Sequence, residues 1–200
     1  MRDARGNELF LVHEGVETDA KTHMIFTTKL YQIIYADPPW DYGVAGQNPR
    51  IGGGAKAHYP TLTIKELCSL PLPAIADNAV LFMWVTSPFL RKDKCWPVIK
   101  AWGFEYKSSF VWDKVKHNMG HYVSVRHECL LLCERGSSPP IKKDFPSLYE
   151  EPRTVHSRKP TYFREMIDEM YPVVNRIELF ARGTLPENWD GWGNEYGGVA

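Results

Sequence analysis

The chain has 200 residues, of which 44% are hydrophobic and 13% aromatic, and this length and composition fit one packed domain. Its 24 Lys and Arg residues balance 24 Asp and Glu residues, which argues against a disordered chain and against a generally basic nucleic-acid-binding surface. The longest apolar run, 79–85, is much shorter than the roughly 20 residues that a membrane helix requires. Because residues 1–8 are also polar, we expect a single domain over residues 1–200 without a signal peptide or membrane anchor.

Five apolar, β-branched or aromatic runs predict strands, and the first two are expected to be buried. The first, 31–36, ends before Pro38 and Pro39, because proline has no N–H to continue the pairing of a strand. The second, 79–85, is almost continuously hydrophobic, which is typical of a strand covered on both faces. The other three are 106–112, 128–133 and 176–181.

Helical patterns lie between these strands. Thr63 and Glu66 have the spacing of a capping box, which predicts a helix that continues to Leu70. A second helix is expected over 89–102, with Pro97 marking either a kink or a late start, and a third over 160–170 with Pro160 in its first position. The alternation of strands and helices predicts an α/β sheet domain.

Three polar, Gly-rich or Pro-rich stretches are longer than simple connections require: 41–60, 114–126 and 136–160. Long loops in a compact domain are often functional. Ligands of open α/β sheets bind beyond the carboxyl ends of the strands, and two of these loops follow strand ends, at Asp37 and Glu134. We therefore expect the three loops to face a substrate.

The cysteines predict reduced thiols in a chain without structural metal. They are Cys68, Cys95, Cys129 and Cys133, and they form no Cys-x-x-Cys pair. Three histidines lie near Glu128 and Cys129, but their spacing matches no known ligand pattern. We expect no metal site.

The sequence Asp-Pro-Pro-Trp at 37–40 places a carboxylate, a rigid carbonyl and an aromatic ring at the end of a buried strand. Asp37 and the Pro38 carbonyl could accept both hydrogen bonds of a planar amino group on a base, while Trp40 covers the face of the heterocycle. Such positioning would favour alkylation of the amino nitrogen. Taken alone, the four residues are equally typical of a strand-ending turn with a core tryptophan.

The chain resembles the MT-A70-type adenine N6-methyltransferases over about residues 31–198. The motifs that carry this resemblance occur in the family's order: Tyr35-Ala36-Asp37-Pro38-Pro39-Trp40, His58-Tyr59-Pro60-Thr61-Leu62-Thr63, Leu81-Phe82-Met83-Trp84-Val85-Thr86, Trp102-Gly103-Phe104, Val111-Trp112-Asp113-Lys114, Arg126-His127-Glu128, Ser157-Arg158-Lys159-Pro160, Ile177-Glu178-Leu179-Phe180-Ala181-Arg182 and Gly193-Asn194-Glu195. The resemblance implies a three-layer Rossmann-like class I methyltransferase sheet of seven strands, mostly parallel with one antiparallel strand. It also implies a circularly permuted order, in which the catalytic motif precedes the cofactor strand, and S-adenosylmethionine as the methyl donor. Residues 1–28 are then a variable N-terminal segment.

The resemblance also assigns roles to individual residues. The catalytic group is Asp37, Pro38, Pro39 and Trp40, and the acceptor pocket is lined by Tyr59, Arg126, His127 and Glu128. The cofactor contacts are Asp37, Ser157, Lys159, Arg182, Asn194 and Glu195, where Glu195 replaces an amide common in relatives.

Basic residues in two of the loops lie among aromatic residues such as Tyr122, Phe145 and Tyr149, a combination that fits contact with a nucleic-acid backbone. The residues expected there are Lys114, Lys116, Lys142, Lys143, Arg153 and Arg158. The resulting hypothesis is a DNA adenine N6-methyltransferase, resembling compact bacterial or phage enzymes, that flips its target base in the cytoplasm of a bacterial cell or phage-infected host. An RNA adenine methyltransferase and a catalytically silent nucleic-acid-binding subunit are the alternatives, and a homodimer stays open.

Overall fold

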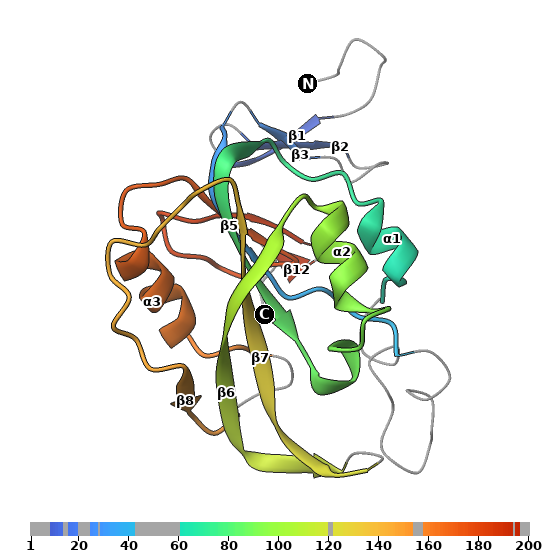
Figure 1. Ribbon diagram of the computed structural model, residues 1–200. Coiled ribbons are helices and arrows are strands. Elements are labelled where there is room, and N and C mark those ends of the chain that lie inside the picture. Colours follow the sequence, from blue (N-terminus) through green and yellow to red (C-terminus); the bar gives the residue numbers. More distant parts are fainter. Residues whose placement is uncertain are drawn as a thin grey trace.

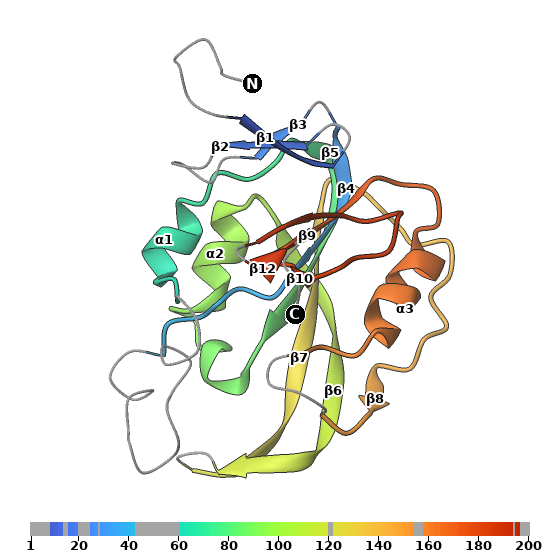
Figure 2. The ribbon, with the colours of Figure 1, turned by 180° about the vertical axis from the view of Figure 1, so that it is seen from behind.

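The computed structural model describes residues 9–13, 16–19, 25–27, 29–42, 61–119, 122–153, 158–193 and 195–196. Its largest element is a seven-stranded sheet with the order β11-β9-β4-β5-β7-β6-β8 (Figures 1 and 2). The strands are β4 (Tyr31–Ala36), β5 (Ile75–Val85), β6 (Glu105–Met119), β7 (Ser124–Arg135), β8 (Leu148–Glu150), β9 (Arg176–Leu179) and β11 (Asp190–Trp192).

The directions of these strands confirm the predicted mostly parallel sheet. Strand β4 pairs in parallel with both β5 and β9, β9 pairs in parallel with β11, and β6 pairs in parallel with β8. Strand β7 is antiparallel to its two neighbours, β5 and β6. The carboxyl ends of the other six strands therefore share one edge of the sheet, which we call the carboxyl edge; the opposite one is the amino edge.

The sheet is covered on both faces, as the near-continuous hydrophobicity of 79–85 predicted. Alternate residues of β4 and β5 enter two separate cores: Ile34 and Leu81 belong to one, Ile33 and Phe82 to the other. Helices α1 (Ile64–Cys68) and α2 (Cys95–Ala101) cover the first face, and α3 (Tyr162–Met170) covers the second (Figures 1 and 2). The result is the expected three-layer α/β arrangement.

The three predicted helices exist, with adjusted starts. The capping box is confirmed, because the Thr63 hydroxyl accepts from the Glu66 N–H and the Glu66 carboxylate accepts from the Thr63 N–H. The second helix starts late, at Cys95, which places Pro97 in the first turn, where no intrahelical N–H bond is lost. Residues Ser87–Phe89 form a separate 3-10 turn, η4. Pro160 precedes α3 by two positions instead of occupying its first turn.

Two smaller sheets complete the described chain. Strands β1 (Leu9–His13), β2 (Val16–Asp19) and β3 (Ile25–Thr27) form an antiparallel sheet within the N-terminal segment. Strands β10 (Arg182–Gly183) and β12 (Glu195–Tyr196) pair in parallel. The described part contains no helix long and apolar enough to cross a membrane. Its cysteines are free thiols, and Cys95, Cys129 and Cys133 are buried.

The expectation of a loop over 114–126 was wrong. Residues 114–119 extend β6 and residues 124–126 extend β7 as a long antiparallel pair, in which Asn118 pairs with Val125 and Met119 with Ser124. The period-two signal of a strand is interrupted there by a bulge at 114–117, which explains why the sequence pattern indicated a loop.

The 136–160 segment contains a strand that the sequence pattern missed, the three-residue β8. Because β7 is antiparallel, this segment leaves the sheet at the amino edge, not at the edge that carries Asp37. It reaches the carboxyl edge only after β8, at Glu151. Of the predicted 41–60 loop, residues 43–60 lie outside the described part.

Trp40 closes the turn after β4 and is part of the core. Its side chain is 4% exposed, its ring stacks on Phe89 with centroids 4.9 Å apart, and its Nε1–H donates to the Trp84 carbonyl at 3.2 Å. A backbone bridge to Leu62 fixes the same turn. The ring expected to cover a bound heterocycle is therefore turned into the first core, in agreement with the interpretation as a strand-ending turn.

We predict that Trp40→Ala lowers the free energy of unfolding by about 3–5 kcal/mol, the usual cost of truncating a buried Trp. Trp40→Phe should lose clearly less, because an aromatic ring can still stack on Phe89. Urea denaturation followed by tryptophan fluorescence measures both. Wild-type stability of Trp40→Ala together with lost activity would instead support a direct role of the ring at the substrate.

Candidate active site at the carboxyl edge of the sheet

The neighbouring strands β4 and β9 are continued in opposite directions along the sheet. The chain after β4 goes to β5 on one side, whereas the chain after β9 goes to β11 on the other. Such a point, where the order of connections reverses, opens a crevice at the carboxyl ends of parallel strands, and open α/β sheets bind their ligands there. Asp37 leaves β4 at this point, and Phe180 and Arg182 leave β9.

A chain of alternating charges lies at this edge. The Lys159 ammonium is 2.5 Å from Asp37 Oδ2 and 3.4 Å from Glu128 Oε2, and Lys114 Nζ is 3.0 Å from Glu128 Oε1. The Lys114 and Lys159 side chains are 8% and 10% exposed, while Asp37 keeps 24% of its side chain exposed. Asp37 is thus the member of this group through which an incoming ligand can make contact.

Burial and neighbouring charges compete in setting the pKa values of these groups. Burial raises the pKa of Asp37 above its usual range, and Glu128 adds to this effect, although Lys159 opposes it. For Lys159, burial alone would lower the pKa, but Asp37 and Glu128 outweigh it and hold the pKa above the ordinary value. Lys159 and Lys114 likewise outweigh burial at Glu128 and lower its pKa. Lys159 therefore stays a cation, and Asp37 is a more basic carboxylate than an exposed one.

Further polar contacts lie near the Asp37, Lys159, Glu128 and Lys114 group, on the strands of the sheet and on α3. Glu178 on β9 is buried and receives two hydrogen bonds from Arg164 of α3, at 2.6 and 3.0 Å. The Trp84 Nε1–H donates to the Tyr35 hydroxyl at 2.6 Å, and the Lys159 ammonium lies over the Trp84 ring, 5.4 Å from its centroid. The first pair joins β9 to α3, and the second joins β5 to β4 beside the Lys159 ammonium.

Of the expected acceptor-pocket residues, Glu128 is brought to Asp37 through Lys159. Arg126 binds elsewhere: its guanidinium donates two hydrogen bonds to Asp113. His127 is paired in register with Asp113. Tyr59 lies outside the described residues.

The expected cofactor residues come together in part. Strand pairing places Arg182 opposite Glu195, and the positive charge of Arg182 acts on Asp37. Phe180, at the end of β9, has a φ of 62°, a left-handed conformation that costs a non-glycine residue roughly 1–2 kcal/mol. Such strain is often kept at functional sites. Ser157 and Asn194 lie outside the described residues.

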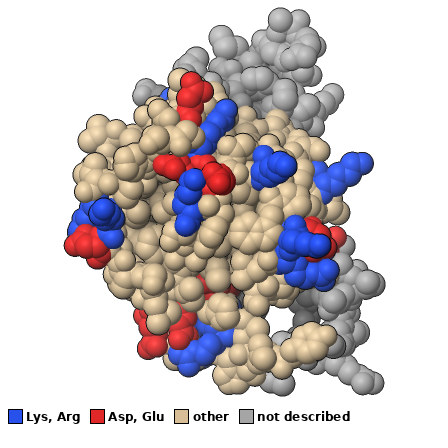
Figure 3. All heavy atoms as spheres, in the orientation of Figure 1, with Lys and Arg blue, Asp and Glu red and all other residues tan. Residues whose placement is uncertain are grey.

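The basic residues expected on a nucleic-acid track fall into three groups. Lys114 is buried against Glu128, so the expectation that it contacts phosphate from the surface does not fit its position. Lys142 pairs with Glu169 near the end of α3 at the amino edge, and Lys143 follows it there. Lys116, Arg153 and Arg158 are in the segments at or beyond the carboxyl edge. On the face in Figure 3, basic and acidic side chains are intermixed.

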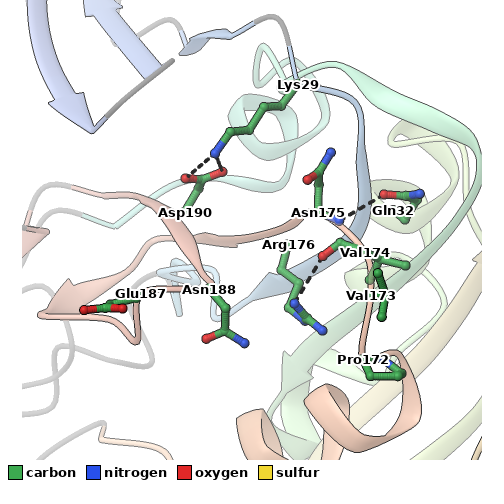
Figure 4. A pocket seen from close by; sticks show the side chains of 10 residues that line it. All are labelled: Lys29, Gln32, Pro172, Val173, Val174, Asn175, Arg176, Glu187, Asn188 and Asp190. Atoms are coloured by element: carbon green, nitrogen blue, oxygen red, sulfur yellow. Dashed lines mark hydrogen bonds and ion pairs between the residues drawn. The ribbon is translucent and has the colours of Figure 1, made fainter.

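A cavity of about 470 Å³ lies at the amino edge (Figure 4). Three of its charged side chains have partners, since Lys29 binds Asp190 at 2.9 Å and Arg176 lies 2.9 Å from Asp168. Figure 4 shows Arg176 directed along the wall toward Val174. This cavity lies at the edge of the sheet opposite to the one that carries Asp37, and it is not part of the candidate active site.

Sequence reasoning missed the supporting residues Glu178 and Arg164 and the inward position of Lys114. The signal for Glu178 was available, because a charged residue inside the apolar run 176–181 requires a partner when the strand is buried. The identity of that partner was not available, since Arg164 belongs to another element and meets Glu178 only in the folded chain.

Comparison with known proteins identifies a family and several relatives of the chain. The MT-A70 family model matches residues 31–195. The chain is 39% identical over 185 residues to the type II methyltransferase M.MunI of Mycoplasma sp, covering 84% of this chain and 78% of that protein. It is 27% identical over 180 residues to the human N(6)-adenosine-methyltransferase catalytic subunit METTL3, with 84% of this chain but 29% of METTL3 covered. A Drosophila melanogaster MT-A70-like N(6)-adenosine-methyltransferase is 26% identical, with 27% of its length covered. The match to the family model from β4 to β12 shows that the chain belongs to the MT-A70 family of methyltransferases.

Proposed function

We propose that this methyltransferase transfers the methyl group of S-adenosylmethionine to the exocyclic N6 of adenine in DNA. The observation that carries this proposal is the position of Asp37, a partly exposed carboxylate of raised pKa at the neighbouring carboxyl ends of β4 and β9. The relatives named N(6)-adenosine-methyltransferases support the acceptor atom, and the relative named a type II methyltransferase favours DNA.

The order of the strands supports the circular permutation. Strand β9, which we assign to the cofactor, follows the catalytic strand β4 in the chain by about 140 residues and yet pairs directly with it. A parallel pair of this kind brings the two carboxyl ends to one crevice whichever strand comes first in the chain. The permutation therefore changes the connections and leaves the site intact.

In the proposed reaction, Asp37 accepts a hydrogen bond from the adenine amino group, and the Pro38 carbonyl is the second acceptor. These two bonds orient the nitrogen toward the methyl donor and draw electron density onto it, which favours attack on an electrophilic carbon. Lys159 holds Asp37 Oδ2 at 2.5 Å, so the carboxylate has a fixed orientation. The raised pKa makes Asp37 a stronger hydrogen-bond acceptor than an exposed carboxylate.

The crevice residues fit S-adenosylmethionine, which supplies an electrophilic methyl group on a sulfonium. Arg182 and Lys159 are cations suited to the carboxylate or the ribose and adenine acceptors of this molecule, and Asp37 is an acceptor suited to its ammonium. Ser157, Asn194 and Glu195 complete the proposed cofactor set by resemblance. Phe180, at the carboxyl end of β9, lies at the position where open α/β sheets bind their ligands.

An intact Asp-Pro-Pro-Trp group argues against a catalytically silent subunit. An RNA substrate is the second candidate, because the same acceptor group would receive a splayed-out adenine of either nucleic acid. Mass analysis of nucleosides, after incubation with the donor and either DNA or RNA, distinguishes the two substrates directly. We expect N6-methyladenine in the DNA reaction.

Asp37→Asn should lower kcat/KM by at least about 100-fold, because a neutral amide replaces the charged acceptor at the reacting nitrogen. Asp77→Asn, at an exposed position near the amino end of β5, is the matched control and should retain wild-type activity. Both are measured by methyl transfer to DNA. Near-normal turnover of Asp37→Asn would contradict the proposed role of this carboxylate.

The acid limb of the pH dependence of kcat/KM should lie above the ordinary carboxyl range, because Asp37 acts as the anion and its pKa is raised. Activity is then lost as the pH falls through this raised value. Lys159→Met removes the charge that lowers the pKa of Asp37 and should move the limb to higher pH, whereas Glu128→Gln should move it to lower pH. If the acid limb does not move in either variant, it reports the titration of a group other than Asp37.

Arg182→Ala should weaken binding of S-adenosylmethionine by roughly 10- to 100-fold, the usual effect of losing a charge-assisted hydrogen bond. The control is Arg135→Ala at the end of β7, at the amino edge, with unchanged affinity. Isothermal titration calorimetry measures both. Failure of the wild-type chain to bind millimolar donor would support the silent-subunit alternative.

DNA affinity should depend on basic residues at the carboxyl edge. Each neutralised phosphate contributes roughly 0.9 to the negative slope of log affinity against log salt. The double variant Lys116→Gln/Arg158→Gln should make this slope shallower by up to about 2, while Lys142→Gln/Lys143→Gln leaves it unchanged. Fluorescence anisotropy on a labelled duplex across a salt series measures both slopes. A shallower slope only for Lys142→Gln/Lys143→Gln would place the DNA contact at the amino edge instead.

A further inference from the structure

The hairpin of β6 and β7 continues beyond the seven-stranded sheet (Figures 1 and 2). Pairing of β7 with β5 ends at Cys129, and pairing of β6 with β8 ends at Asp113, but β6 and β7 remain paired as far as Met119 and Ser124. We call residues 114–119 and 122–127 the ribbon. It projects from the same edge of the sheet as Asp37.

The base of the ribbon is anchored to the sheet. The Asp113 carboxylate accepts hydrogen bonds from the Arg126 guanidinium and, at 2.9 Å, from the Val115 N–H. Val115 has a φ of 61°, and four residues of β6 lie opposite one of β7 in this bulge. Arg126 also lies 3.6 Å from Glu150 of β8. The direction of the ribbon is therefore set by specific contacts at its base.

The composition of the ribbon fits a polyanion. Residues 114–127 contain three Lys or Arg and three His but no Asp or Glu, in a chain whose net charge is zero. Lys116 and His117 are exposed, while Lys114 is directed inward to Glu128. Toward the tip, Tyr122 is 92% exposed and Val123 66%. An exposed aromatic ring on a basic two-stranded element offers a face on which a base can stack.

The ribbon is also close enough to act on a base bound at Asp37. Glu128, where the ribbon joins β7, is 3.4 Å from the Lys159 ammonium that binds Asp37. Six residues of extended chain from Glu128 to Tyr122 span at most about 20 Å. The major groove of B-DNA, about 12 Å wide, admits a two-stranded ribbon.

We propose that the ribbon enters a groove of the DNA and that Tyr122 fills the gap in the base stack left by the adenine that turns out toward Asp37. This inference rests on the proposed function and deepens it, because an adenine inside a duplex cannot reach a carboxylate at a sheet edge without leaving the stack. DNA-binding proteins frequently insert side chains between base steps of a duplex that they deform.

The test begins with the intact protein and genomic DNA that lacks adenine methylation. The wild-type chain methylates this DNA, and sequencing of the product identifies the target site. Two short duplexes are then made: one has the target adenine paired with thymine, and the other has an abasic position opposite it. The second duplex has lost the pairing that resists extrusion, so it requires less help from an inserted side chain.

Tyr122→Ala should lower kcat/KM on the paired duplex roughly 10- to 100-fold, the range expected for loss of one base–aromatic stack. On the abasic duplex most of this loss should disappear, which a folding defect would not produce. Tyr122→Phe should retain activity on both duplexes. Tyr106→Ala, an exposed tyrosine at the other end of β6, is the control and should behave as wild type.

Equal activity of Tyr122→Ala and wild type on the paired duplex would overturn the inference, and so would an equal loss on both duplexes. Conversion of a wild-type dimer to a monomer by Tyr122→Ala, seen by analytical ultracentrifugation, would assign the ribbon to contact with a second copy of the chain. Absence of methylation by the wild-type chain would count against the proposed function itself, and is thereby distinguished from failure of the ribbon alone.

Discussion

The ion pair between Asp37 and Lys159 joins two points 122 positions apart in the chain and holds the carboxyl edge together. One partner follows the central strand β4, and the other lies just before α3. Through Glu128 the same lysine is tied to β7, and through Lys114 to β6. Removal of any one member leaves an uncompensated charge in a mostly buried place, which commonly costs several kcal/mol. The group therefore links the conformation of four elements to the environment of one carboxylate.

This group can be buried because the sheet beneath it is covered on both sides. Core residues alternate between the α1–α2 face and the α3 face along β4 and β5. Because both faces are packed, the backbone is held rigidly up to the carboxyl edge. Rigid elements hold functional groups more accurately than loops do. Trp40 contributes to the same rigidity by packing into the first core, and in this way the turn that carries Asp37 is anchored on Phe89.

The two edges of the sheet have different characters. At the amino edge, the cavity near Arg176 and the pair of Lys142 with Glu169 have their charges matched locally. At the carboxyl edge, the ribbon adds positive charge and exposed aromatic surface next to a carboxylate with a raised pKa. A polyanionic substrate whose base must be extruded needs both properties at one place, and only the carboxyl edge combines them among the described residues.

Local sequence determined much of this protein. The five predicted strands, the capping box at Thr63 and the position of Asp37 after β4 could all be predicted, because each depends on residues close together in the chain. The ordered motifs also indicated the family and its donor. What the sequence could not decide was which charges meet: Lys114 and Lys142 look alike in the sequence, yet one is buried beside Glu128 and the other is exposed at the far edge.

Only the tertiary structure decided which charges meet. The antiparallel direction of β7 places residues 136–147 at the amino edge and keeps residues 124–128 at the carboxyl edge. The same holds for Trp40, whose ring could have covered a base or filled the core. Its surroundings, Phe89 and the Trp84 carbonyl, come from other elements and exist only after folding. Patterns within one segment fix its secondary structure, whereas the partners of a buried side chain depend on strand order and direction, which arise from the packing of the whole chain.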